Sequence, residues 1–100
     1  MTKRYILDGH AVVAEPDLMT WARWFEKAEQ YVSLDEIGDV RVSTVFLGLD
    51  HSFGSGPPLL FETMVFGGPL DQEQDRYSTW DEAVAGHAAM VARVKSEPQR

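Results

Sequence analysis

The stretch that decides the fold is LLFETMVFGGPLDQEQDRYSTWDEAVAGHAAMVARV, residues 59–94. It begins with an apolar run, 59–66, which ends at the Gly-Gly-Pro of 67–69 and is typical of a strand. Both faces of this strand are mostly apolar, a pattern typical of a central strand or of one covered on both sides. The acidic stretch 67–76 is predicted to be a surface loop, and a helix that returns to the same sheet follows it.

That final helix has a clear start in the sequence. Thr79 and Glu82 have the spacing of a capping box, and Asp81 favours the first turn through the helix dipole. The residues behind them recur at helical spacing on one mostly apolar stripe: Trp80, Ala83, Val84, His87, Val91 and Val94. The end of the chain, 97–100, is expected to fray.

The first thirty residues predict a hairpin and a helix. Asp8-Gly9 stands between two short apolar runs, 4–7 and 10–13, and this dipeptide is a strong hairpin signal. An extended segment with a turn is the alternative, because both runs are short. Apolar residues then recur at helical spacing over 17–30, which predicts the first helix.

The middle of the chain predicts two more strands. Gly38-Asp39 separates 31–37 from 40–49, and a Gly-X pair between such runs suits a type II′ hairpin turn. The glycines and prolines of 51–58 predict a loop. The predicted fold class is therefore α+β: an antiparallel sheet of three to five strands with two helices packed on it, in the order β(β)-α-β-β-β-α.

Length and composition indicate a single domain, 1–100, that folds without covalent cross-links. The chain has no cysteine, which excludes disulfides, thiolate metal sites and cysteine nucleophiles. No apolar run approaches the roughly 18 residues of a membrane span, and the N-terminal residues do not resemble a signal peptide. We expect a cytoplasmic protein without a cofactor.

The net charge of −7 is concentrated in the middle of the chain. Residues 35–82 hold ten acids and only two bases, Arg41 and Arg76, and carry −8. The acids are Asp35, Glu36, Asp39, Asp50, Glu62, Asp71, Glu73, Asp75, Asp81 and Glu82. Such a field repels nucleic acid and anionic membranes and attracts basic protein surfaces. The expected partner is a protein with a basic surface.

Five of these acids form the strongest surface feature of the sequence: Asp71, Glu73, Asp75, Asp81 and Glu82. As a functional surface they would dock into a basic groove and imitate the phosphates of a nucleic acid. The alternative is a solvated loop that keeps the domain soluble.

A second candidate site consists of Asp8, His10, Asp50 and His51, which lie at predicted strand ends or turns. Imidazole and carboxylate groups bind Zn²⁺ or Mn²⁺ and also make acid/base pairs. The spacing matches no known ligand motif, so the alternative is turn-capping carboxylates with exposed imidazoles.

Glu62 and His87 are single polar residues on apolar faces. A carboxylate in such a setting is a candidate acid or base, and the alternatives are an ion pair with Arg41 or Arg76 or a position at the sheet margin. His87 is a candidate ligand, or else a histidine at the edge of the core with a hydrogen-bonded partner. If the 59–66 strand and the final helix pack as predicted, Glu62 is a candidate for the hydrogen-bonded partner of His87.

Three blocks of the chain, 42–51, 58–68 and 76–91, together resemble a group of small, uncharacterised proteins encoded by tailed phages, prophages and actinomycete genomes. The likeness extends over about residues 5–94. It brings no activity and no functional residues, but it implies a mobile-element setting. Small acidic phage proteins of that setting are often inhibitors of host defence, anti-CRISPR proteins among them.

Three interpretations follow from the sequence. The first is a non-enzymatic binding protein of phage or prophage type that inhibits a host defence complex by docking on its basic surface. The second is a small metal-dependent hydrolase that uses Asp8, His10, Asp50 and His51. The third is a structural or assembly subunit, in which the two-sided apolar strand and the tryptophans form a homodimer surface.

Overall fold

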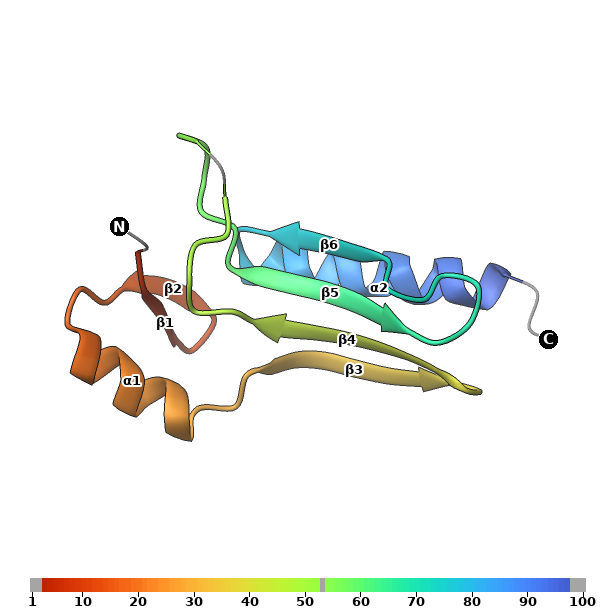
Figure 1. The fold of residues 1–100 in the computed structure, drawn as a ribbon, viewed down its shortest axis with the longest axis horizontal. Helices are drawn as coiled ribbons and strands as arrows, with labels where there is room; N and C mark the ends of the chain where they lie inside the picture. The colour runs from red at the N-terminus through yellow and green to blue at the C-terminus, as the bar shows by residue number, and fades with distance from the viewer. Residues whose placement is uncertain (1–2, 53, 98–100) are drawn as a thin grey trace.

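The computed structural model describes residues 3–52 and 54–97 and is built on a four-stranded antiparallel sheet (Figure 1). The elements in chain order are β1 (Tyr5–Asp8), β2 (Ala11–Ala14), α1 (Leu18–Lys27), β3 (Tyr31–Ile37), β4 (Val40–Phe46), β5 (Phe61–Phe66), β6 (Gln74–Tyr77) and α2 (Trp80–Ser96). The α+β class is confirmed, with one sheet in the order β3-β4-β5-β6 and a separate hairpin of β1 and β2.

The N-terminal hairpin and α1 form where the sequence predicts them. Asp8 pairs with Ala11, so the turn residues are Gly9 and His10, one position later than expected. Gly9 has a φ of +61°, which glycine adopts without a steric penalty. Asp17 begins α1 by accepting a hydrogen bond of 2.8 Å from the backbone N–H of Thr20. Both predicted elements are confirmed.

The prediction that residues 67–76 are entirely loop is wrong, because the last of them belong to β6. Gln74, Asp75 and Arg76 pair with Met64, Thr63 and Glu62 of β5. An edge strand with polar side chains lacks the apolar alternation by which strands are recognised in a sequence. With β6 on its outer side, β5 is a central strand, as its composition predicts.

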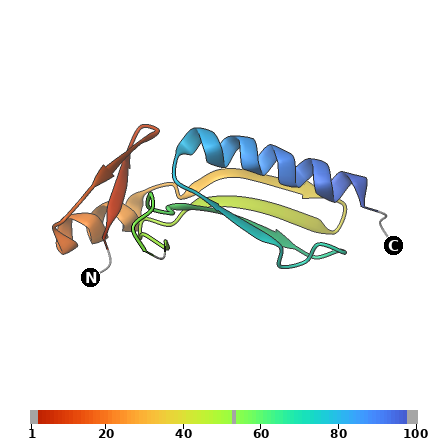
Figure 2. The same ribbon diagram turned by 90° about the horizontal axis from the view of Figure 1, so that it is seen from above.

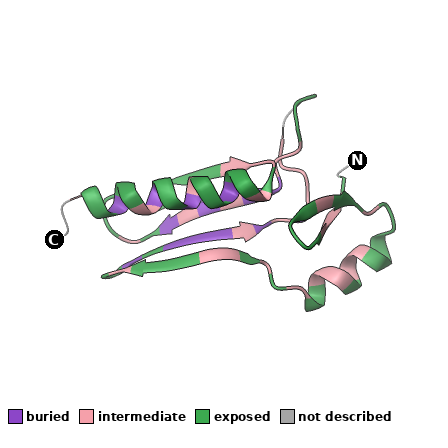
Figure 3. Ribbon diagram, turned by 180° about the vertical axis from the view of Figure 1, so that it is seen from behind, coloured by how far each residue is buried: buried purple, intermediate pink, exposed green. Residues whose placement is uncertain are grey.

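One face of the sheet is covered by α2, with the β1–β2 hairpin beside the start of that helix (Figure 2). The buried residues form two clusters, one around Val42, Val65 and Met90 and one around Phe46 and Phe61. Trp24 of α1 packs edge-on against Phe46 at the end of the sheet. In Figure 3 the buried positions follow β4, β5 and the inner side of α2.

The buried stripe of α2 differs from the predicted one at two positions. Ala83, His87 and Val94 are buried as expected, but Met90 lies with them in the core. Val84 is instead 46% exposed. The true stripe follows spacings of three and four residues from Ala83, which places Val84 beyond its edge.

The opposite face of the sheet has no described helix or strand over it (Figure 2). The pairing register places eleven side chains on this open face: Tyr31, Leu34, Glu36, Arg41, Ser43, Val45, Glu62, Met64, Phe66, Gln74 and Arg76. β5, predicted to be central or covered on both sides, is thus central and covered on one side within the described chain.

The ends of the chain are described in part. Glu97 is the C-terminal cap of α2, and its backbone N–H donates to the carbonyl of Val94. The remainder of the predicted frayed end, 98–100, lies outside the described residues. Neither of the described helices has the length and apolar character that a membrane span requires.

Candidate functional site

A chain of polar side chains runs through the core between α2 and the sheet. His87 Nε2 lies 2.7 Å from Asp35 Oδ2, and His87 Nδ1 lies 2.7 Å from Thr44 Oγ1. Thr44 Oγ1 in turn lies 2.5 Å from Thr63 Oγ1. Asp35, Thr44 and Thr63 come from β3, β4 and β5, so one helix residue is connected to three neighbouring strands.

The direction of these hydrogen bonds follows from the chemistry of the groups. An ionised Asp35 carboxylate only accepts, so Nε2 of a neutral His87 carries the proton and Nδ1 accepts. The Thr44 hydroxyl then donates to Nδ1 and receives a hydrogen bond from Thr63. Both ring nitrogens of His87 are thus satisfied by hydrogen bonds.

This Asp–His–Thr arrangement has the order of groups found in nucleophilic hydrolases, but its hydroxyls are inaccessible. Thr44 and Thr63 are fully buried and His87 is 4% exposed, while only the Asp35 side chain reaches solvent. A substrate cannot approach either hydroxyl in this structure. The arrangement therefore serves to satisfy polar groups in the core.

The suggested partnership of His87 with Glu62 is wrong. Glu62 lies on the open face, on the other side of the sheet from His87. Its Oε2 instead accepts a hydrogen bond of 3.0 Å from Nε of Arg76, the directly opposite residue on β6. The ion-pair alternative for Glu62 is confirmed, because adjacent strands bring opposite charges together across their register.

Tyr77 of β6 lies at the end of the same buried layer. Its hydroxyl is buried and has no hydrogen-bond partner within the described residues. Burial raises the pKa of this phenol, and the nearby Thr63 hydroxyl opposes the rise without reaching hydrogen-bond geometry. Gly86 allows the close approach, because a Cβ at that position would lie 2.2 Å from the Tyr77 ring.

The four residues of the metal or acid/base candidate do not form a common site. Asp50 lies beside the start of β1, where its backbone N–H donates to the carbonyl of Lys3, and Asp8 ends that strand. The pair Asp8 and His10 is therefore separated from the pair Asp50 and His51 by the length of β1. No group of three or more histidines and acids suited to a metal ion occurs within residues 3–52 and 54–97.

Asp50 and His10, one residue from each pair, have structural contacts. Asp50 Oδ1 accepts from the backbone N–H groups of Ser52 at 2.8 Å and Leu59 at 3.0 Å. Hydrogen bonds from Ser52, together with that from Leu59, lower the pKa of the Asp50 carboxyl. The ring of His10 stacks on Trp80 with centroids 3.8 Å apart. These contacts correspond to the turn-capping alternative.

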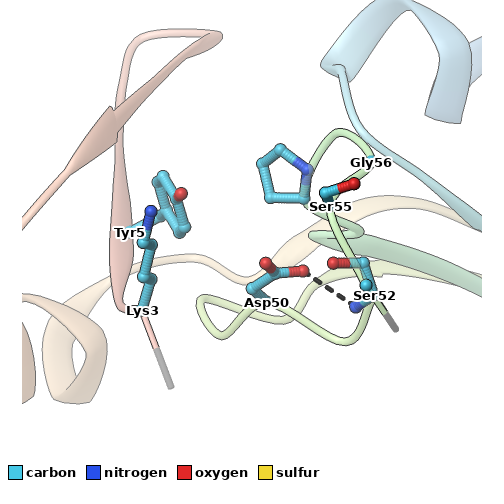
Figure 4. Close-up of a pocket in the computed structure, with 8 residues that line it drawn as sticks. Lys3, Tyr5, Asp50, Ser52, Ser55 and Gly56 are labelled. Carbon is cyan, nitrogen blue, oxygen red and sulfur yellow. Dashed lines mark hydrogen bonds between the residues drawn. The ribbon is translucent and has the colours of Figure 1, made fainter. Parts of the chain in front are cut away.

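A shallow pocket borders the loop that Asp50 stabilises (Figure 4). Its volume is about 660 Å³, and its lining residues are Lys3, Tyr5, Asp50, Ser52, Gly54, Ser55, Gly56 and Pro58. In Figure 4 the Asp50 carboxylate turns toward the backbone of Ser52. Apart from Lys3 and Asp50 the described lining is uncharged, and its other polar side chains are the hydroxyl groups of Tyr5, Ser52 and Ser55.

The five acids of the predicted binding surface are all exposed and follow the β6 edge to the start of α2. Three have structural contacts: Asp71 accepts from Gly67 N at 2.6 Å, Glu73 pairs with Arg93 at 3.3 Å, and Glu82 closes the capping box with Thr79. We name the line of five acids the acidic edge.

The other two acids of the acidic edge are Asp75 and Asp81. Their side chains make no hydrogen bond or ion pair with any described residue. Asp75 stands opposite Thr63 and so lies toward the helix side of β6, the side on which Asp81 begins α2. These two carboxylates are the members of the acidic edge with most capacity for a partner.

No protein-family model matches the sequence, and no curated protein or solved structure is significantly similar to it.

Proposed function

We propose that this protein is a non-enzymatic binding protein whose acidic edge docks on the basic surface of another protein. The observation that carries the proposal is the exposed pair Asp75 and Asp81, whose side chains make no hydrogen bond or ion pair within the described residues. A carboxylate without an internal partner keeps its full charge available for a cationic group.

The folded chain separates its charges in a way that supports this role. Of the ten acids between residues 35 and 82, only Glu36 and Glu62 lie on the open face. Both bases of that stretch, Arg41 and Arg76, lie there too, and each pairs with one of these acids. The open face is thus neutral, and the other eight acids carry the −8 of this stretch.

The candidate catalytic groups support a binding role rather than a reaction. The hydroxyls of the Asp35–His87–Thr44 chain are buried, and Asp50 holds a loop. Each group has a structural task that explains its position. A catalytic role for the same groups would need them to be reachable by a substrate.

The resemblance to small phage, prophage and actinomycete proteins suggests the setting in which such binding would act. We propose that the partner is a host defence complex with a nucleic-acid-binding surface, so that the protein acts as an anti-CRISPR-like inhibitor in the host cytosol. A negatively charged edge would occupy cationic side chains that otherwise hold phosphates.

The test is affinity capture from an actinomycete host lysate with the tagged wild-type protein and two charge-matched variants. The first combines Asp75→Asn and Asp81→Asn. The control combines Asp8→Asn and Glu26→Gln, which also removes two negative charges, from exposed positions on the hairpin and α1. Mass spectrometry should identify a basic protein that the wild type and the control retain and the first variant loses.

Equal capture by all three proteins would contradict the acidic edge as the binding surface. Equal loss from both variants would show that only net charge matters. A captured protein without a basic surface would contradict the proposed class of partner.

A further inference from the structure

The open face exposes more large apolar side chains than is usual for a sheet face that contacts water. Tyr31, Leu34 and Phe66 are 49%, 46% and 45% exposed, although all three are large apolar or aromatic residues. Antiparallel sheets that face water on one side usually alternate between apolar and polar faces. The uncovered side of β5 departs from that rule, because it carries Met64 and Phe66 next to Glu62.

Tyr31, Met64 and Phe66 surround a shallow hollow rather than lying scattered, and Leu34 lies on the same face outside its lining. A depression of about 300 Å³ lies on the open face, with Tyr31 of β3, Val45 of β4, and Met64 and Phe66 of β5 in its lining. A contiguous exposed apolar area with polar residues at its rim is typical of an interaction surface. Arg41, Ser43 and Glu62 complete the lining on its polar side.

The charge of the open face restricts what can cover it. The whole chain carries −7, yet this face holds two acids and two bases that pair internally, Arg41 with Glu36 and Arg76 with Glu62. Two copies of a chain with this net charge repel each other wherever acidic surfaces meet. They can approach closely where both surfaces are neutral and apolar.

We propose that the open face binds a second copy of this chain and forms a symmetric homodimer. In such a dimer the same patch is used by both subunits, and two sheets pack face to face about 10 Å apart. The acidic edge lies at the margin of this arrangement and remains exposed. The dimer is therefore a property separate from the proposed docking on a basic partner.

The size of the patch predicts a weak dimer. Interfaces of standard size use about 20–30 residues on each side, whereas the open face offers the eleven side chains that the register places there. An interface of this size belongs to the weak and transient class, so dimer and monomer exchange with concentration.

The test is sedimentation equilibrium of the purified chain over a dilution series from about 1 mM to about 1 μM, a range that covers weak association. The mass should fall from twice 11.3 kDa toward 11.3 kDa as the protein is diluted. Leu34→Glu adds a charge to the open face and should weaken association at least tenfold. Val84→Glu is the matched control, because Val84 is equally exposed at 46% but lies on α2.

Three outcomes would overturn the proposal: a wild-type monomer at every concentration, unchanged association of Leu34→Glu, or equal weakening by Val84→Glu. Circular dichroism of both variants checks that they are folded. The double variant of Asp75 and Asp81 should dimerise like the wild type, so failure of the dimer and failure of the acidic edge are distinguishable.

Discussion

His87 shows how a single polar residue on an apolar helix face is accommodated in this core. Both of its ring nitrogens have partners, Thr44 on one side and Asp35 on the other. The sequence indicates a hydrogen-bonded histidine at this position, and that part is confirmed. It cannot identify the partners, because they lie 43 and 52 residues away and depend on the strand register.

Thr44→Val tests whether the buried polar chain contributes to stability. The substitution keeps the shape of the side chain but leaves His87 Nδ1 and the Thr63 hydroxyl without their partner. An unsatisfied buried polar group costs about 1–3 kcal/mol, so the free energy of unfolding in urea should fall by that amount.

Asp35→Asn is the comparison for this experiment. The Asp35 side chain is 51% exposed and an amide oxygen still accepts from Nε2, so this variant should lose less stability than Thr44→Val. Equal losses from both variants, or none from Thr44→Val, would contradict the assignment of Thr44 as the buried partner.

Asp50→Asn tests the carboxylate that holds the 51–58 loop. Hydrogen bonds from Ser52 and Leu59 lower the pKa of Asp50 in the folded state. The ionised Asp50 carboxylate therefore contributes its full stabilisation at pH values above its pKa in the unfolded chain, about 3.9. This contribution is lost as the pH falls through the lower pKa that Asp50 has in the folded state. The variant should be less stable than the wild type at pH 7, and the difference should shrink in acid.

Urea midpoints measured from about pH 7 to about pH 2 check this pH dependence. Asp39→Asn, at an exposed carboxylate in the β3–β4 turn, is the control and should show a smaller difference. A gap between wild type and Asp50→Asn that stays constant across the range would contradict the role assigned to the ionised carboxylate.

At the level of elements, local signals predict most of the fold. The turns at Gly38 and the β1–β2 hairpin, the caps at Asp17 and Thr79, and the central strand β5 all follow from short-range patterns. Such features are encoded by neighbouring residues, which is why they can be predicted. The edge strand β6 is missed because its polar side chains carry no apolar period.

The position of α1 and the open face depend instead on tertiary packing. Trp21 of α1 donates its ring N–H to the carbonyl of Tyr5, and Gly48 leaves room for Phe25. These contacts hold α1 beside the hairpin and leave the second face of the sheet uncovered. The spacing of apolar residues in the sequence does not predict which face of a sheet a helix will cover.

Gly86→Ala tests the close packing of α2 on β6. Helix propensity alone predicts a gain of about 1 kcal/mol for this change. The new Cβ would meet the Tyr77 ring at 2.2 Å, so we expect a loss of about 1–3 kcal/mol in the free energy of unfolding.

The effect of Gly86→Ala on the free energy of unfolding should change sign when Tyr77 is replaced by a smaller residue. In a Tyr77→Leu background the ring atoms that collide with the new Cβ are gone, and Gly86→Ala should become neutral or stabilising. A stabilising effect of Gly86→Ala in the wild-type background, measured by urea unfolding, would contradict the packing described here.

At the scale of the whole molecule, the fold divides an acidic chain into two chemically different surfaces. The open face is neutral and carries an apolar patch, and the acidic edge carries exposed carboxylates at its margin. The charge imbalance is visible in the sequence, but the separation is not, because it depends on which strand residues share a face.

The separation of the open face from the acidic edge predicts that dimerisation and docking on a basic partner respond to salt in opposite ways. Association through the open face brings two chains of charge −7 together, so salt screens their repulsion and should strengthen the dimer. Docking of the acidic edge on a basic partner is an attraction between opposite charges, which salt weakens. Sedimentation at about 0.05 M and about 0.5 M NaCl checks the first response, and weaker association at the higher salt would contradict it.

The most direct test of the binding role is the salt dependence of the complex captured through the acidic edge. We expect its affinity to fall steeply as NaCl is raised from about 0.05 M to about 0.5 M, and to fall less in the double variant of Asp75 and Asp81. A complex that survives about 0.5 M salt with unchanged affinity would contradict docking by the acidic edge.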